Sequence, residues 1–401
     1  MTLLQESFPE GAVRHPQYTV TKGQVHHHTL ARLQDHLGLA DYGRSCPGRT
    51  LLNVVVTAAA HLTSLFAVCR RLVHAPSGET ARKALLAALP ERDALLRGLN
   101  RALAADLPRA LRHRRPRLAA DLTLLPYHGE PFEHAREVYR SQPRSGTSHF
   151  HAYATAYLVE HGQRFTVAFT AVDRGEDLAA VLQRLLRQAA RAGVRPGLVL
   201  LDRGFFSVGV IRYLQAARCP FVMPVVFRGR RPDHPLGPSG TNIFRCWRRS
   251  GWGRYTLTNA AGTTATVSVC VKCRNYRGQW KRHGRQPLVY AYWGFRPPSC
   301  DWVRETYRQR FGIEASYRQL RQARVRTTTR NPVVRLFYVG VGLLLRNVWV
   351  WLHWQVLSTP RRGSRRLNLH RLGFQTFLHW LGQVVEELLG ISHSVQAERP
   401  L

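Results

Sequence analysis

The stretch RLAADLTLLP (117–126) is mostly apolar and carries no charge apart from its basic first residue and a single acid, Asp121. A short apolar run of this kind predicts a buried β-strand. A carboxylate inside such a strand is unfavourable unless it is paired or bound to a metal ion. Asp121 is therefore the first candidate functional residue.

Strand and helix patterns alternate along the chain after this stretch. HFHAYATAYLVE (149–160) and RFTVAFTAVD (164–173) predict strands, DLAAVLQRLLRQAARAG (177–193) predicts a helix, and GLVLLD (197–202) predicts a short buried strand. A further helix at 207–217 and a strand at 219–227 follow. The order of three strands, helix, strand, helix and strand resembles a ribonuclease H-like core, an α/β fold with a mixed sheet.

A change of composition interrupts this order at residues 228–299, which are rich in Gly, Arg and Trp. Strand patterns recur there at 254–259, 264–273 and 286–295, and they predict a β-rich insertion. Residues 300–358 are expected to complete the core. The run LFYVGVGLLL (336–345) has ten apolar residues, whereas a bilayer-spanning helix needs roughly 20. It therefore predicts a buried helix, and we expect no membrane partner.

The two ends of the chain have their own patterns. Residues 24–112 carry apolar side chains at helical spacing and run into the basic segment RHRRPR (112–117). Residues 1–117 thus predict an α-helical N-terminal domain, which either binds DNA ends or caps the main domain. At the other end, residues 359–401 combine the basic run TPRRGSRR (359–366), expected to be a solvated linker, with an amphipathic helical stretch at 372–390.

The charge balance indicates the partner. The 401-residue chain carries a formal net charge of +35, and only four of its basic residues are lysines. Codon bias towards arginine explains part of this composition, but the excess of base over acid favours nucleic acid over a membrane surface or an acidic protein. The seven scattered cysteines and the absence of a secretory signal predict a reduced, cytoplasmic, nucleoid-associated protein.

A second acid ends the predicted strand GLVLLD. Asp202 is followed by an Arg-Gly pair, and α/β sheets place ligands at the carboxyl ends of their strands. Asp173 has the same local setting and is its rival. We prefer Asp202 because it ends the fourth predicted strand, which lies next to the first in the ribonuclease H order. An acid at a strand end can also be a simple turn or helix-cap residue.

The third acid lies in DWVRETYRQRFGIEASYRQLRQ (301–322). On a helical wheel, one stripe about 60° wide holds Tyr307, Arg310, Glu314 and Arg321. A helix of this kind can present one carboxylate together with cations for phosphate. The alternative is a solvated salt bridge between Arg310 and Glu314. Gly312 weakens the expectation of an unbroken helix.

The spacing Tyr307-x2-Arg310-x3-Glu314-x6-Arg321 resembles the Y-x2-R-x3-E-x6-K signature of a group of DDE-type insertion-sequence transposases. The final lysine of that signature is an arginine here. The neighbourhoods DLTLLPYHG, at Asp121, and LLDRGFF, at Asp202, also resemble the group's first and second acid motifs. The resemblance covers about residues 118–345.

The resemblance implies a transposase that binds double-stranded DNA, both transposon ends and target. Asp121, Asp202 and Glu314 would be catalytic and would hold two Mg²⁺ or Mn²⁺ ions. The DNA backbone would be contacted by Tyr307, Arg310 and Arg321. Endonucleolytic cleavage by metal-activated water would precede attack of the freed 3′-OH on target DNA, by a homodimer on paired ends. The alternatives are a nuclease of the same fold that does not join strands and an inactive, transposase-derived DNA-binding protein.

Tryptophans and cysteines of residues 228–299 give weaker signals. Trp280 lies among cations in RNYRGQWKRHG (274–284), a setting that suits stacking on an unpaired base. In some of the transposases that the chain resembles, a tryptophan of the insertion holds a flipped base; a small aromatic core is the alternative. A zinc site at Cys246, Cys270, Cys273 and Cys300 is a minor alternative, because Cys270 and Cys273 share a strand pattern that lacks a glycine turn.

Overall fold

The computed structural model describes residues 19–112, 115–159, 164–278, 283–361 and 364–393. The chain forms two compact units. The first, here called the helical unit, comprises the described parts of Met1–Pro108, Leu125–His151 and Ser316–Leu401. The second, the sheet unit, comprises those of Arg109–Leu124 and Ala152–Ala315. Each unit is therefore assembled from segments that are far apart in the sequence.

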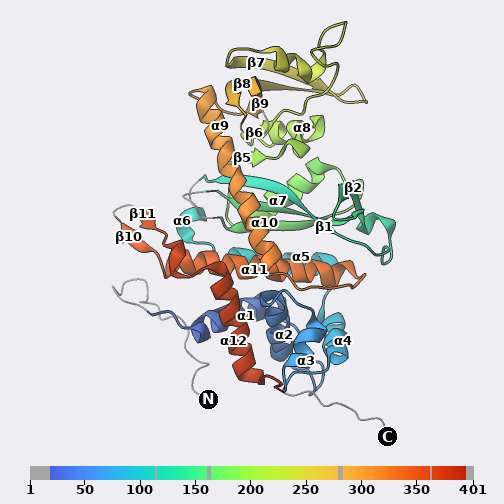
Figure 1. Ribbon diagram of the computed structural model, residues 1–401, viewed down its shortest axis with the longest axis vertical. Helices are drawn as coiled ribbons and strands as arrows, with labels where there is room; N and C mark the ends of the chain where they lie inside the picture. Colours follow the sequence, from blue (N-terminus) through green and yellow to red (C-terminus); the bar gives the residue numbers. More distant parts are fainter. Residues whose placement is uncertain (1–18, 113–114, 160–163, 279–282, 362–363, 394–401) are drawn as a thin grey trace. The chain divides into compact units, whose positions relative to one another are not determined.

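A mixed β-sheet is the frame of the sheet unit (Figure 1). Its strand order is β2-β3-β1-β5-β6-β9-β8-β7, with β4 also pairing with β3. Strands β1 and β3 continue into the helical unit, where β2 forms a hairpin with the first residues of β3. The bounds are β1 Arg117–Pro126, β2 Tyr139–Arg144, β3 Thr147–Leu158, β4 Thr166–Val172, β5 Leu198–Leu201, β6 Phe221–Pro224, β7 Gly251–Thr258, β8 Thr264–Arg277 and β9 His283–Trp293.

The pairing of β1 with β5 sets the geometry of the site. The two strands are parallel, and Ala120 of β1 faces Leu201 of β5 in the register. The residue after Ala120 is Asp121, and the residue after Leu201 is Asp202. The prediction that the strand ending in Asp202 lies beside the first strand is confirmed, as is the mixed α/β class of the fold.

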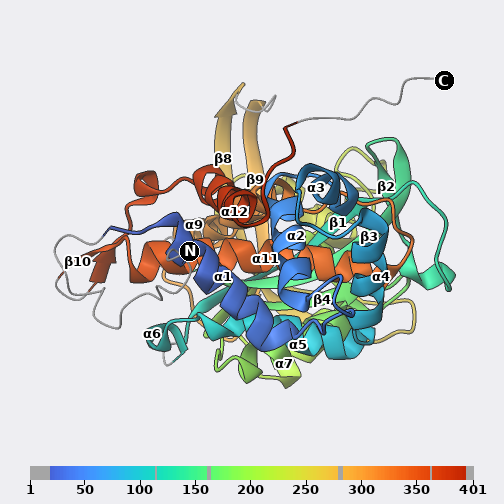
Figure 2. The same ribbon diagram turned by 90° about the horizontal axis from the view of Figure 1, so that it is seen from below.

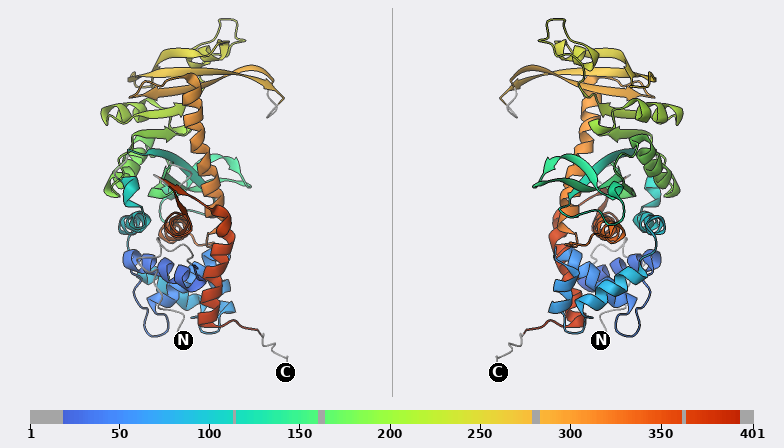
Figure 3. Two further views of the ribbon diagram at one scale, coloured as in Figure 1. Left: turned by 90° about the vertical axis from the view of Figure 1, so that its left-hand side faces the viewer. Right: turned by 90° about the vertical axis from the view of Figure 1, so that its right-hand side faces the viewer.

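The strands predicted within residues 228–299 extend this sheet instead of forming one of their own. Strand β9 pairs antiparallel with β6, with Val222 facing Tyr292, and β8 and β7 follow in antiparallel order. Figure 3 shows β8 and β9 as long neighbouring strands. Residues 228–299 thus join the core sheet at β6, to which β9 is paired. Residues of both strands line a large cavity at this junction.

Four helices accompany the strands of the sheet unit. They are α6 Arg109–Arg112, α7 Leu178–Arg191, α8 Val208–Ala216 and α9 Cys300–Arg308. Three of them begin at a side chain that accepts a hydrogen bond from the first helical turn, namely Asp177, Ser207 and Ser299. In Figure 3, α8 lies to one side of the strands and α9 to the other.

The helix that carries the signature is interrupted, as Gly312 suggested. Helix α9 ends at Arg308, a 3-10 turn spans Gln309–Phe311, and α10 spans Gly312–Gln322. The side chain of Arg164 lies directly against Gly312, where a Cβ atom would overlap its guanidinium group. Arg164 Nη1 donates to the carbonyl oxygen of Gly312 at 2.8 Å. The glycine therefore admits an arginine that binds the backbone at the break.

The helical unit is built around α11 (Pro332–Gln355), which packs against α1, α2, α5 and α12 (Figure 2). Helix α11 is apolar and long enough to span a membrane, but 89% of its most apolar window is buried inside the protein. This burial confirms the predicted buried helix. The other helices are α1 Lys22–Leu37, α2 Gly48–Ala60, α3 Leu65–Arg71, α4 Gly78–Ala88, α5 Arg92–Ala105 and α12 Phe374–Leu389.

The basic run at 359–366 does not behave as a solvated linker where the structure describes it. Strands β10 (Thr359–Arg361) and β11 (Ser364–Arg366) pair as a hairpin. Arg365 Nη1 donates to the carbonyl oxygen of Trp354 at 2.9 Å and reaches that of Gln355 as well. Arg365 therefore caps the carboxyl end of α11, where cations are favoured.

Replacing Gly342 of α11 by alanine is expected to destabilise the protein by roughly 1–3 kcal/mol, the range for overpacking a core. A Cβ atom at Gly342 would overlap the carbonyl oxygen of Ala323, a backbone atom that cannot rotate away. The matched control is Gly209→Ala in α8, where the nearest atom to the added carbon lies at 3.8 Å. Chemical denaturation should show a lower free energy of unfolding for Gly342→Ala and an unchanged or higher one for the control. Equal values for the two variants would contradict the close packing.

Candidate active site

Two aspartates of the sheet unit share one arginine. Arg310 Nη2 lies 3.0 Å from Asp121 Oδ1 and 3.4 Å from Asp202 Oδ1. The side chain of Arg310 is only 6% exposed, and that of Asp121 is 15% exposed. A single nitrogen of one buried guanidinium group therefore bridges two carboxylates from neighbouring strands and offsets part of their negative charge.

Burial makes this arrangement electrostatically demanding. The pKa of Asp121 is raised from its ordinary value to about 6. Loss of solvation is the largest cause, the charge of Arg310 opposes it, and the charge of nearby Asp202 adds to it. The backbone N–H of Leu122 also donates to Asp121 Oδ1, at 2.9 Å. The Asp121 carboxylate thus depends on a cation beside it.

Aromatic rings position the arginine. The guanidinium carbon of Arg310 lies 5.9 Å from the centre of the Tyr307 ring, within the range of a cation–π contact. The Tyr307 ring in turn packs against Tyr290 at 5.2 Å and Phe311 at 6.1 Å. Tyr307 is buried, and its burial raises the pKa of its hydroxyl well above the usual range. The strand β9 thereby supports the signature helix through Tyr290.

A cavity of about 1250 Å³ opens beside the acid pair. Asp202, Tyr307, Arg310 and Glu314 all line it, so the predicted third acid faces the same space as the second. Four further arginines line the cavity, and all four are exposed and form no ion pair with the described residues: Arg203, Arg228, Arg245 and Arg285. The cavity therefore combines two carboxylates with a strongly cationic wall.

The remaining predicted residues are placed as follows. Asp173, the rival of Asp202, follows β4, which pairs with β3 rather than with β1. Arg321 is exposed in the last turn of α10, within the helical unit. Trp280 lies outside the described residues. The DNA contacts expected of Tyr307, Arg310, Arg321 and Trp280 stay predictions.

The oxygen donors of the pair fit a divalent cation. Mg²⁺ and Mn²⁺ prefer carboxylate oxygens, and Asp121 and Asp202 already converge on one positive nitrogen. Within the described residues, however, no group of three His, Cys, Asp or Glu side chains is arranged to hold a metal ion. Glu314 thus lines the same cavity but does not form a three-carboxylate group with Asp121 and Asp202. Arg310 occupies the position between the two aspartates.

Several of these contacts have no local signal in the amino-acid sequence. Arg164 was not singled out, because nothing local links it to Gly312. Arg203 and Arg228 have no such signal either, whereas Arg245 and Arg285 belong to the mixed aromatic and cationic pattern of residues 228–299. Only the structure places these four arginines on one cavity.

Cys246 is exposed, whereas Cys270, Cys273 and Cys300 have backbone carbonyl oxygens as hydrogen-bond partners. Cys273 Sγ donates to the carbonyl oxygen of Trp247 at 3.4 Å, and Cys300 Sγ to that of Gly251 at 3.7 Å. Cys270 is buried, and its pKa is raised by that burial. These cysteines therefore serve in the packing of β7 and β8.

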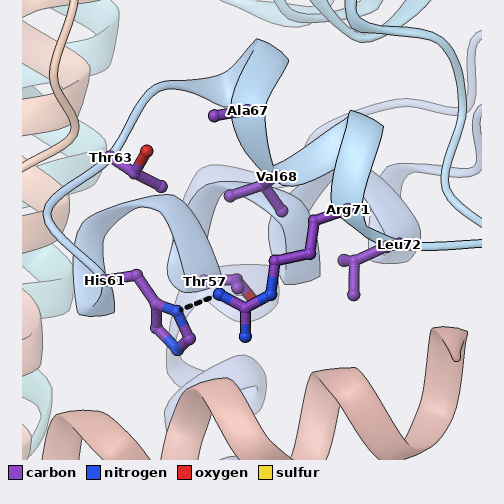
Figure 4. A pocket seen from close by; sticks show the side chains of 7 residues that line it. All are labelled: Thr57, His61, Thr63, Ala67, Val68, Arg71 and Leu72. Atoms are coloured by element: carbon purple, nitrogen blue, oxygen red, sulfur yellow. Dashed lines mark hydrogen bonds between the residues drawn. The ribbon is translucent and has the colours of Figure 1, made fainter. Parts of the chain in front are cut away.

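A second cavity, in the helical unit, is structural. Figure 4 shows His61 and Arg71 turned towards each other; Arg71 Nη1 and His61 Nδ1 are 2.9 Å apart. Arg71 also forms an ion pair with Glu386 of α12. This cluster ties α12 to α3. With a volume of about 260 Å³, the cavity is much smaller than the one beside the acid pair.

Parallel strands that join two aspartates beside a cationic cavity define a ribonuclease H-like core suited to nucleic-acid phosphates. The chain belongs to the family of the transposase DDE domain, whose model matches residues 112–345. It is accordingly a DNA transposase, and DDE transposases generally use divalent metal ions.

A solved structure supports the fold over nearly the whole chain. It is the cryo-EM structure of the piggyBac transposase synaptic complex with hairpin DNA, with a TM-score of 0.51 and 10% sequence identity. The match covers 93% of this chain and 81% of that chain. Among curated protein sequences, none matches this chain.

The pKa of Asp121 predicts a specific pH dependence of stability in metal-free buffer. Because the pKa rises from 3.8 to about 6 on folding, the folded state holds a proton that the unfolded state releases. The free energy of unfolding should therefore fall as pH rises through this window, by up to about 3 kcal/mol. Chemical denaturation of the wild type at several pH values would show this fall, and Asp121→Asn should lack it.

Asp233→Asn is the control for this experiment, because Asp233 is exposed. It should keep the wild-type pH profile. Parallel profiles for the wild type and Asp121→Asn would mean that Asp121 titrates near its ordinary value, and the electrostatic picture of the site would be wrong.

Proposed function

We propose that this transposase cuts the ends of its transposon and joins them to target DNA with Asp121, Asp202 and Glu314 as its catalytic carboxylates. The observation that carries the proposal is the convergence of Asp121 and Asp202 on one cation, at 3.0 and 3.4 Å. Glu314 supports it by lining the same cavity as Asp202.

The three acids would hold Mg²⁺ or Mn²⁺. The chemistry that divalent cations supply at such sites is activation of the attacking oxygen and neutralisation of charge at the leaving oxygen. Asp121 and Asp202 are fixed by the pairing of β1 with β5, so their carboxylates are held in place before DNA arrives. Glu314 lies on α10 just after the break at Gln309–Phe311, where a small rotation of the helix would move it relative to the pair.

DNA would enter through the cationic cavity. Arginine binds phosphate with two parallel hydrogen bonds, and exposed arginines without acidic partners keep that capacity. Arg245 lies with its guanidinium carbon 4.4 Å from the centre of the Phe227 ring, so the pair presents a flat, positively charged surface. Arg228, Arg245, Arg285 and Asp202 line the same cavity, so a DNA backbone bound by these arginines would lie in the space that Asp202 faces.

Three further proposals concern assembly, location and the N-terminal helices. Transposition brings two transposon ends together, so the active form is proposed to be a homodimer on paired ends, in the cytoplasm at the nucleoid. The N-terminal helices of residues 1–117 are proposed to contact transposon-end DNA.

A cleavage and joining assay with Mn²⁺ tests the proposed chemistry. Labelled duplexes that carry the element's terminal sequences are incubated with the wild type, Asp202→Asn or the surface control Asp233→Asn. The wild type and the control should cut and join, and Asp202→Asn should bind the DNA with a loss of cleavage of at least about 100-fold, the scale of lost transition-state stabilisation.

Other outcomes of that assay favour other functions. Cleavage without joining would indicate a nuclease of the same fold. Binding without cleavage by the wild type would indicate an inactive DNA-binding protein. If Asp202→Asn cut as well as the wild type, Asp202 would not be catalytic, and Asp173 would be the next residue to change.

The cationic cavity gives a separate prediction for DNA affinity. Each of Arg245→Ala and Arg285→Ala should weaken DNA binding and reduce the slope of log affinity against log salt by about 0.9, because one fewer phosphate is neutralised. Arg191→Ala, at the exposed end of α7 and away from the cavity lining, is the control. Fluorescence anisotropy at several salt concentrations measures the slopes, and unchanged slopes for both cavity variants would exclude this path for DNA.

A further inference from the structure

Arg310 lies between Asp121 and Asp202, the position where the proposed chemistry requires a divalent metal ion. Its Nη2 atom contacts both Asp121 Oδ1 and Asp202 Oδ1. An Mg²⁺ ion with these two carboxylates as ligands needs oxygens at about 2.0–2.1 Å from its centre. The guanidinium group and such a cation cannot occupy the same place between the two carboxylates. Binding of one therefore excludes the other from this position.

We propose that Arg310 is a displaceable counter-ion, which holds the two aspartates together in the metal-free enzyme and gives up this position when a divalent cation binds. The inference rests on the proposed catalytic role of Asp121 and Asp202. It adds a positioning role for Arg310 that is played before DNA and metal arrive. Arg310 and the cation are then competitors for one site.

The burial of Asp121 explains why a resident cation is needed. Asp121 is largely buried, and the neighbouring carboxylate of Asp202, which is partly exposed, repels its negative charge unless a positive charge lies between them. The covalently attached guanidinium is always present at the site, unlike a dissolved ion. It therefore keeps both strand ends in the geometry that the divalent cation later uses.

The surroundings of Arg310 provide a second place for its side chain. The same residue lines the large cavity, whose other arginines have no ion pair with the described residues. A guanidinium group released from the aspartates would emerge into this cavity, where the phosphates of bound DNA would replace the two carboxylates as its partners. Cation binding and phosphate binding by Arg310 would then favour each other, as thermodynamic linkage requires.

The test measures Mn²⁺ binding by the full chain without DNA, from the electron paramagnetic resonance signal of free Mn²⁺. Arg310→Gln removes the competitor, so this variant should bind Mn²⁺ about tenfold more tightly than the wild type, within the usual range of coupling between sites. Arg310→Lys keeps a positive charge there and should stay close to the wild type. Arg308→Gln is the matched control. Arg308 precedes Arg310 by two residues in the chain, but it is exposed and pairs with Glu305 instead of the two aspartates.

A measurement on the wild-type protein does not depend on the folding of a variant. An arginine-specific dicarbonyl reagent modifies exposed guanidinium groups, and peptide mass spectrometry reads each position. Arg310 should react slowly in metal-free protein, because its side chain is 6% exposed, and faster when Mn²⁺ is added. Arg308, at 53% exposure, should react at the same rate in both conditions.

Two results would overturn the proposal. One is weaker or unchanged Mn²⁺ binding by folded Arg310→Gln, which would make Arg310 part of the cation site or irrelevant to it. The other is an Arg310 that Mn²⁺ leaves equally protected from the reagent. Neither result bears on whether the wild type cuts and joins DNA, so failure of this inference is distinct from failure of the proposed function.

Discussion

The site depends on one buried interaction, the contact of the Arg310 guanidinium with two carboxylates. Asp121 and Asp202 come from strands about 80 residues apart in the chain, and they are neighbours only because β1 and β5 pair in parallel. That pairing is itself stabilised by apolar burial, since Leu118, Leu200 and Leu201 are inaccessible to solvent. The hydrophobic sheet thus forces two like charges together, and a third segment must supply the opposite charge.

The strands and the two acids could be predicted because their signals are local. RLAADLTLLP and GLVLLD are short, mostly apolar runs, each with one acid, and their length favours buried strands over helices. Strand β2 gave no such signal: YRSQPR is polar, and its burial pattern is mostly exposed because it lies at the sheet edge. Its pairing comes from β3 and from the turn at Ser145-Gly146, where both residues have positive φ.

The partner of Arg310 could not be predicted in the same way. The helical wheel placed Arg310 and Glu314 on one stripe, which indicates a shared face but not what that face meets. The sequence also suggested a salt bridge between them, whereas the structure pairs Arg310 with the two aspartates. The break at Gln309–Phe311 is part of the reason, because Gly312 accommodates Arg164 there and the helix does not continue with ideal geometry. A contact between residues more than 100 positions apart left no trace in local spacing.

The same limit applies to the helices. Amphipathic patterns in residues 24–112 predicted helices correctly, but a pattern does not state which surface its apolar face will meet. The structure gathers α1, α2 and α5 around α11, a helix more than 200 residues later in the chain. Close approach is possible there because Gly340 of α11 leaves room for Leu99 of α5.

These contacts explain how the excess positive charge of the chain is distributed between paired and unpaired arginines among the described residues. A protein with 24 acids and 59 Lys and Arg residues has few carboxylates to spare. Several of them are engaged in ion pairs that tie elements together, such as Arg32 with Asp106 and Lys272 with Asp301. The arginines of the large cavity have no such partners among the described residues, and their mutual repulsion is relieved only when an anion enters. Arg310 differs from them because its anions are already built into the sheet. The arginines around the site therefore have two roles. Arg310 stabilises the acid pair, and the cavity arginines are available to bind phosphate. Arg310 can bind phosphate as well only after a divalent cation has replaced it between the two aspartates.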